Sequence, residues 1–195
     1  MKLYSDAGGT APSPRRVRIF IAEKKMTVEI VELNLHEENR TPEFAEKNPM
    51  QTVPVLELED GTCIAESIAI CRYLEAISPE APQLFGSTPI EIANVEMWNR
   101  RSELAFYLPI ELAGGFLGRR VAERARKQVA TMLRLFDDEL ATRPFIAGDA
   151  YSVADITTQV AIDFGIRFNG IAVPDDAGNF RRWQAEIAAR PSAAA

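Results

Sequence analysis

The hydrophobic pattern of this chain changes once along its length, and that change limits the architecture. Up to about residue 80 the chain alternates short strand patterns with helical patterns, whereas the part after Pro89 has helical periodicity and almost no strand pattern. This order predicts an α/β domain followed by an all-α domain. Three prolines with Gly and Ser lie within residues 78–89, which is the composition of a linker. We therefore predict domains at residues 1–80 and 90–195, joined by a linker at residues 81–89.

The first domain shows the order strand, helix, strand, then a hairpin, then a helix. Asp60 and Gly61 lie between two strand patterns, and an Asp-Gly pair favours a tight turn because glycine adopts positive φ without steric cost. This order is that of a thioredoxin-like domain. The predicted strands are residues 2–4, 27–33, 53–58 and 62–65, and the predicted helices are residues 15–25, 42–47 and 67–77.

Composition excludes several classes of protein. The 22 basic and 28 acidic residues give a net charge of -6, which argues against nucleic acid as a partner because phosphate binding needs a concentrated basic surface. No apolar run approaches the length of a membrane span, so no membrane partner is expected.

Cys63 and Cys71 have neither CxxC nor zinc spacing and indicate buried thiols in a reducing compartment, the cytoplasm. His36 is the single histidine and is expected in solvent, so no His-rich metal site is expected.

Val53-Pro54 opens a strand pattern with a residue that cannot donate a ladder hydrogen bond. A cis peptide bond explains the pair, because it turns the preceding backbone N–H and C=O outward, where an extended peptide could pair with them. The alternative is an ordinary trans proline at the start of a strand.

Glu66-Ser67 lies where the hairpin ends and the next helix begins. Ser67 fits an N-cap, and a helix N-terminus presents N–H groups and positive dipole that suit a carboxylate. Glu66 would suit an ammonium group, so the pair matches a zwitterionic α-amino acid end. The alternative is that Ser67 only caps the helix.

Residues 48–56, together with Glu66-Ser67 and Tyr73-Leu74, resemble the glutathione transferase superfamily of cytosolic, bacterial-like type. The resemblance implies that Val53 pairs through its backbone with the cysteinyl part of glutathione, that Pro54 is cis, and that Glu66 and Ser67 hold the γ-glutamyl end. Gln51 belongs to the same binding surface. The resemblance also places Arg40 where the family often has a basic residue for the glycine carboxylate of glutathione.

A second motif supports the same resemblance. Ser152 and Asp155 form a variant of the capping box, and Tyr151 has hydrophobic-staple spacing to Ile156. These residues are expected to start a helix and to have no catalytic role. The segment resembles the capping motif of the helical domain in glutathione transferases, so the resemblance covers nearly the whole chain.

The catalytic loop departs from the family pattern. The resemblance places Ala11 where many classes have a catalytic serine or cysteine, and Tyr4 lies inside the first strand as an expected core residue. Ser13 and Thr10 flank the presumed thiol position and are the candidate catalytic donors, with Ser13 favoured. The alternatives are that both hydroxyls only decorate the helix start, or that main-chain N–H groups there hold the anion.

The resemblance implies a homodimeric enzyme that uses glutathione as co-substrate, needs no metal, and conjugates the thiolate to small hydrophobic electrophiles, as in detoxification. A glutathione-dependent peroxidase or disulfide-bond reductase on the same fold is one alternative, and a non-catalytic binding module is another. The second substrate is expected between the domains, where an aromatic stripe at helical spacing could also be core. Its candidate lining is Met97, Trp98, Arg101, Leu104, Phe106 and Tyr107.

Overall fold

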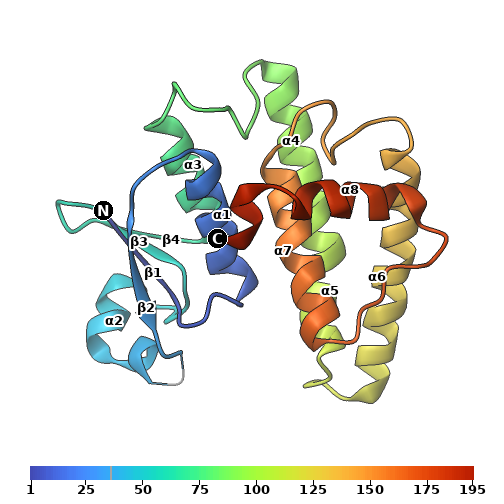
Figure 1. Ribbon diagram of the computed structural model, residues 1–195. Coiled ribbons are helices and arrows are strands. Elements are labelled where there is room, and N and C mark those ends of the chain that lie inside the picture. Colours follow the sequence, from blue (N-terminus) through green and yellow to red (C-terminus); the bar gives the residue numbers. More distant parts are fainter. Residues whose placement is uncertain (36) are drawn as a thin grey trace. The chain divides into compact units, whose positions relative to one another are not determined.

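The computed structural model describes residues 1–35 and 37–195, so the expectation for His36 lies outside the described residues. The chain forms two compact units, Met1–Pro82 with Ala194–Ala195, and Gln83–Ala193. Figure 1 shows a sheet with helices in the first unit and helices alone in the second. The predicted combination of a thioredoxin-like domain and an all-α domain is confirmed.

The first unit is a β1α1β2 crossover followed by a hairpin and a helix. In the described part of the chain, four strands form one sheet in the order β2-β1-β3-β4, with β1 parallel to β2 and antiparallel to β3. The turn of the hairpin contains Gly61 at φ 84°, as the Asp-Gly pair predicted. The elements are β1 (Lys2–Asp6), α1 (Pro12–Glu23), β2 (Glu29–Leu33), η1 (Glu38–Arg40), α2 (Pro42–Lys47), β3 (Val55–Glu57), β4 (Cys63–Ala65) and α3 (Ser67–Ala76).

Helices cover both faces of this sheet. Successive side chains of a strand point to opposite faces, so each strand contributes side chains to both layers of packing. Leu3 and Leu56 are paired and fully buried, and they lie on the face that α1 and α3 cover. Val55 lies on the other face and packs with Phe44 of α2. Because helices pack on both faces of the sheet, the strand ends are held in fixed positions, and the loops that follow them start from fixed points.

The second unit is built around one apolar core. α6 shows why: its buried side chains recur every three or four residues from Ala122 to Leu140, so one stripe of the helix faces inward. Its elements are α4 (Pro89–Ser102), the π-helix η2 (Glu103–Tyr107), α5 (Leu108–Ala113), α6 (Arg119–Leu140), α7 (Val153–Phe168), α8 (Gly178–Ala188) and η3 (Pro191–Ala194), whose last residue is counted with the first unit.

The predicted domain boundaries, with a linker at residues 81–89, remain a prediction. Leu84 and Phe85, which the sequence placed in the linker, are buried, and the Leu84 carbonyl accepts a hydrogen bond from the Val153 N–H (2.9 Å).

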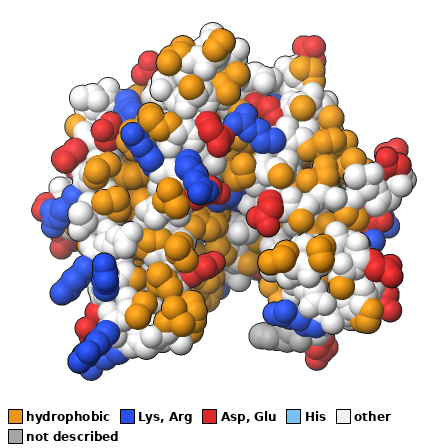
Figure 2. Space-filling view, turned by 180° about the vertical axis from the view of Figure 1, so that it is seen from behind, with side chains coloured by type: hydrophobic (Ala, Val, Ile, Leu, Met, Phe, Trp, Pro, Cys, Tyr) orange, Lys and Arg blue, Asp and Glu red, His pale blue; other side chains and the backbone are white. Residues whose placement is uncertain are grey.

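Among the described residues, no helix combines the length and apolar character needed to cross a membrane. On the face drawn in Figure 2, basic and acidic side chains are interspersed among apolar ones.

Candidate functional site

The strand register brings the three predicted binding segments to one end of the sheet. Tyr4 of β1 lies opposite Val55 at the start of β3, and Val55 lies opposite Ala65 at the end of β4. The loop after β1, the segment before β3 and the segment after β4 therefore leave the sheet at the same end. Val53 lies in the segment before β3, Glu66 lies directly after β4, and the loop after β1 leads into α1, which contains Ser13.

Two buried asparagines hold the segment before β3. Gln51 has φ 53°, a conformation that few side chains adopt. The Asn39 side-chain amide donates to the Gln51 carbonyl (2.7 Å), and the Gln51 N–H donates to the Asn48 carbonyl (2.9 Å). Asn48 also donates through Nδ2 to the Thr52 carbonyl (2.8 Å). Because Asn39 and Asn48 are only 5% and 3% exposed, these bonds are shielded from water.

The Val53-Pro54 peptide bond is cis, so this part of the prediction is confirmed. Pro54 is buried and Val53 is half-buried, packed against the cluster of Leu33, Phe44 and Val55. The backbone of Val53 thus follows directly after the segment that the asparagines fix.

The Glu66-Ser67 junction differs from the prediction in one respect. Ser67 is the first helical residue of α3, and the N-cap position belongs to Glu66, whose side chain makes no capping hydrogen bond. The expectation that Ser67 is the N-cap was therefore wrong. The physical reason is that Glu66 adopts φ 68°, which starts the helix one residue earlier. Glu66 is exposed and Ser67 is buried, with Ser67 Oγ accepting a hydrogen bond from Arg16 Nη1 (3.0 Å).

The start of α1 is already occupied by a carboxylate of the protein. Asp6 Oδ2 accepts hydrogen bonds from the Thr10 N–H (2.7 Å) and the Ala11 N–H (2.9 Å). Asp6 is 4% exposed, and its Oδ1 lies 3.4 Å from Arg18 Nη2. The Thr10 and Ala11 amides therefore bind an internal anion, which weighs against the alternative that they hold a thiolate.

Prolines remove most of the other main-chain donors from this helix start. Pro12 and Pro14 have no N–H, and the Ala11 N–H is taken by Asp6. Within residues 11–14, all of which the structure describes, Ser13 alone retains an N–H that Asp6 does not bind. Ser13 is half-buried and presents both this amide and a hydroxyl in the first turn of α1. Ser13 therefore offers both an N–H and a hydroxyl as candidate donors, whereas Asp6 already binds the N–H of Thr10 and leaves that residue its hydroxyl.

Tyr4 lies in a structural network, as expected for a residue inside the first strand. Its hydroxyl donates to Glu57 Oε2 (2.5 Å), and Lys47 Nζ donates to the same oxygen (2.8 Å). Burial and the hydrogen bond to Glu57 raise the pKa of Tyr4, so the phenol stays protonated at neutral pH. This is the opposite of what an activated tyrosine needs. Cys71 is likewise inert, because burial raises its pKa to about 12.

Arg40 ends the short helix η1 and is exposed, next in sequence to the buried Asn39. β2 ends beside β1, since Leu33 pairs with Asp6, so the segment that leads to Arg40 starts at the same end of the sheet as the other loops. Among the described residues, no group of three or more His, Cys, Asp or Glu side chains is arranged to hold a metal ion.

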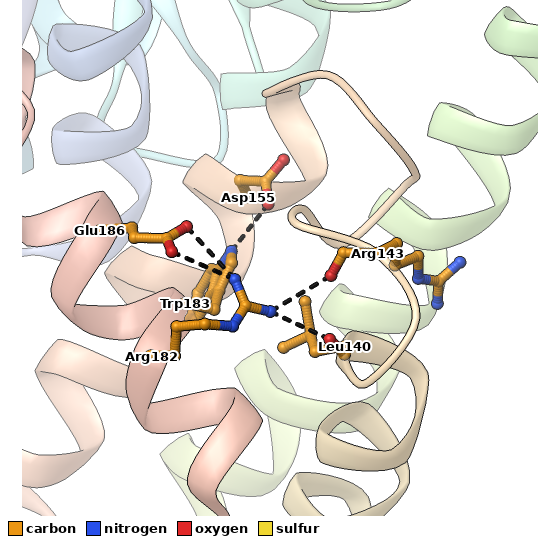
Figure 3. Close-up of polar contacts among 6 residues, drawn as sticks. All are labelled: Leu140, Arg143, Asp155, Arg182, Trp183 and Glu186. Atoms are coloured by element: carbon orange, nitrogen blue, oxygen red, sulfur yellow. Dashed lines mark hydrogen bonds and ion pairs between the residues drawn. The ribbon is translucent and has the colours of Figure 1, made fainter.

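The predicted cap in the helical unit is confirmed. Ser152 and Asp155 form the capping box that starts α7, and the Asp155 carboxylate also accepts from Trp183 Nε1 (2.8 Å) (Figure 3). In the same view Arg182 Nη2 donates to the carbonyls of Leu140 and Arg143, so α8 satisfies carbonyl groups at and beyond the end of α6.

The predicted lining of a second-substrate pocket divides into two groups. Trp98 and Phe106 are 3% and 0% exposed and belong to the helical core. Tyr107 packs partly buried against that core. Met97, Arg101 and Leu104 are exposed. A groove of about 440 Å³ within the helical unit is lined by Trp98, Arg101, Leu104, Ala105, Gln128, Met132, Leu135, Phe136 and Glu139.

Sequence reasoning missed the residues that hold the binding segments in place. Asn39 and Arg16 are buried polar side chains whose partners lie 12 and 51 residues away, whereas the buried Asn48 bonds Thr52, four residues away. Asp6 carried a usable signal, since an acidic side chain directly after a strand can accept from the amides of the following loop.

These features define a class of protein: a thioredoxin-like domain with a cis-proline segment directly before β3, followed by an all-helical domain. Residues 1–76 match the family model "Glutathione S-transferase, N-terminal domain", and residues 104–191 match "Glutathione S-transferase, C-terminal domain". The chain belongs to the glutathione S-transferase family, a family of transferases.

Two individual relatives agree with this assignment over 98% of the chain. Glutathione S-transferase 2 of Saccharomyces cerevisiae is 38% identical over 207 residues, which cover 98% of this chain and 87% of that protein. The structure of a glutathione S-transferase domain-containing protein of Marinobacter aquaeolei has a TM-score of 0.90 at 35% identity and covers 98% of this chain and 99% of its own. Elongation factor 1-gamma of Rattus norvegicus is 37% identical over 125 residues, 61% of this chain but 28% of that protein.

Proposed function

We propose that this chain binds glutathione at the end of the sheet where its three segments meet and transfers the thiolate to small hydrophobic electrophiles. The observation that carries the proposal is the register, which gathers the cis-proline segment, the start of α1 and the start of α3 at one place. The yeast relative is named a glutathione S-transferase, which supports the same activity here.

Each segment matches one part of the tripeptide. The Val53 backbone would pair with the cysteinyl unit as an added strand does. The exposed Glu66 carboxylate would hold the γ-glutamyl ammonium, and Ser67 with the α3 N-terminus would hold its carboxylate. Gln51 lies beside Val53, and Arg40 would neutralise the glycine carboxylate.

Ser13 is the proposed donor to the sulfur. A thiol with a pKa near 8.5 is only slightly ionised at neutral pH, and lowering that pKa by about two units requires roughly 2.7 kcal/mol of preferential stabilisation of the anion. A hydrogen bond to a charged group contributes about 1.5–3 kcal/mol. The thiol proton leaves to solvent, the sulfur forms a bond to the electrophilic carbon, and the leaving group departs with the electrons of its bond.

Binding and donor identity have separate tests. Retention on immobilised glutathione and a glutathione-dependent thermal shift test binding, and absence of both would refute the proposal. Ser13→Ala is expected to raise the pKa of the bound thiol by about one to two units, measured by ultraviolet titration of the thiolate. Thr10→Ala is the matched control and should leave that pKa within about 0.3 units, which is the size of a surface effect.

Two other activities remain as alternatives. Assays with an aryl halide and with a hydroperoxide separate a transferase from a glutathione-dependent peroxidase, and a mixed-disulfide substrate tests a reductase. Elongation factor 1-gamma, which is similar over 125 residues, is not named as a transferase, and this supports a binding module without turnover. Glutathione binding without turnover of any of these substrates would favour the binding module over the three enzyme activities.

The proposal includes a homodimer in the cytoplasm. The apolar groove of the helical unit, with Leu104 and Leu135 exposed at 55% and 44%, is a surface that a second copy could cover. Cys63 and Cys71 are both free thiols, which suits a reducing compartment. Light scattering of the purified chain tests the dimer, and a monomer at micromolar concentration would refute it.

A further inference from the structure

A buried arginine supports the serine that faces the proposed γ-glutamyl carboxylate. Arg16 lies on α1 and is 2% exposed. Its Nη1 donates to Ser67 Oγ across the packed helices α1 and α3, at 3.0 Å and 51 residues apart in sequence. The contact therefore joins the scaffold to one of the binding segments.

The chemistry of this contact fixes the role of the hydroxyl. A guanidinium group has only donors, whereas a serine hydroxyl has one hydrogen and two acceptor lone pairs. Ser67 Oγ must therefore accept from Arg16, and its own hydrogen remains for a second partner. Donation by a charged group also polarises the hydroxyl, and such chains strengthen one another in a shielded site.

The surroundings of Ser67 favour an anion as that second partner. Ser67 is the first residue of α3, where the amides of the first turn have no partner within the helix. The side chain of Glu66 makes no capping bond there. A carboxylate at this position would meet backbone N–H groups, the positive end of the helix dipole and the Ser67 hydroxyl, with the Arg16 charge behind it.

We propose that Arg16 is a positioning residue: it orients the Ser67 hydroxyl toward the α-carboxylate of a γ-glutamyl ligand and thereby makes recognition of that carboxylate depend on a residue that does not touch it. This inference rests on the proposed function. It differs from a purely structural role for Arg16, which would weaken all ligands equally or only lower stability.

The experiment compares two ligands by calorimetry. Glutathione carries the α-carboxylate, and 4-aminobutyryl-cysteinyl-glycine lacks it while keeping the ammonium. The wild-type chain should prefer glutathione. Arg16→Met should reduce that preference by roughly tenfold, the equivalent of one charge-assisted hydrogen bond. In a Ser67→Ala background the same substitution should change the preference by less than about twofold, because the two residues act as one unit.

Arg18→Met is the matched control, since Arg18 lies on the same helix and pairs with Asp6 instead of Ser67. It should leave the preference unchanged. If Arg16→Met does not fold, Arg16→Lys takes its place, because it keeps the charge and loses the planar fork; a smaller loss that disappears in the Ser67→Ala background is then expected.

Equal weakening of both ligands, or additive effects of Arg16 and Ser67 substitutions, would overturn the inference. A wild-type chain that binds glutathione without preferring it over the analogue would overturn it as well. No binding of glutathione by the wild-type chain would instead refute the proposed function, so the two failures are distinguishable.

Discussion

The carboxylate of Asp155 should stabilise the helical unit more than any exposed acidic residue near it. Asp155 is fully buried. Its Oδ1 accepts from the Ile146 N–H (2.8 Å) and Trp183 Nε1 (2.8 Å), and its Oδ2 accepts from the N–H (2.9 Å) and hydroxyl (3.0 Å) of Ser152. Asp155→Asn keeps one oxygen and replaces the other with an amide nitrogen, which faces two donors.

The expected cost follows from these contacts. Two hydrogen bonds to a charged acceptor are lost, each contributing about 1.5–3 kcal/mol, so the gross loss is about 3–6 kcal/mol. Burial raises the pKa of Asp155, which means that the ionised wild-type group pays a desolvation cost that the amide avoids. We therefore expect the free energy of unfolding to fall by about 2–5 kcal/mol.

Tryptophan fluorescence in urea measures this change selectively. The chain has two tryptophans, and both Trp98 and Trp183 lie in the core of the helical unit. Asp149→Asn is the matched control, because Asp149 is an exposed carboxylate in the loop before α7. A loss below about 1 kcal/mol for Asp155→Asn, or a loss equal to that of the control, would refute the reasoning.

Two further predictions concern the first unit. Cys63 is half-buried and Cys71 fully buried with a pKa of about 12, so a disulfide reagent at neutral pH should modify Cys63 first and Cys71 only after unfolding; equal rates would contradict this. Hydrogen bonds from Lys47 and then Tyr4 lower the pKa of Glu57, so its stabilising contribution is present above the unfolded pKa and is lost as pH falls through the folded pKa. Glu57→Gln should therefore lower the melting temperature at pH 7 and have a smaller effect near pH 3; a constant difference would count against the network.

Much of the fold was predictable because its signals are local. The switch of hydrophobic period separated the two kinds of architecture, and Asp60-Gly61 marked the hairpin turn. The capping box at Ser152 and Asp155 was also predictable, since both partners lie three residues apart.

Most of the contacts that hold the candidate site were not predictable, because they are long-range or depend on unusual backbone conformations. Arg16 and Ser67 are 51 residues apart, and nothing in their local sequence pairs them. Glu66 adopts positive φ although its residue type disfavours that region, which displaced the predicted N-cap by one residue. Asp6 shows the intermediate case, where the partners are four and five residues away and the signal could have been used.

The π-helix at Glu103–Tyr107 affects how this sequence should be aligned with others. A π-helical turn contains about one residue more than an α-helical turn. Loss of one codon here would convert the segment to α-helix without breaking it, and because four α-helical residues turn the chain about as far as five π-helical ones, the residues beyond would keep their orientation relative to those before. Trp98 and Ile110 now face the same core from either side of this segment. A one-residue gap at this point in an alignment therefore leaves the same α5 side chains in the core, so the residues on either side of the gap should still be aligned with one another.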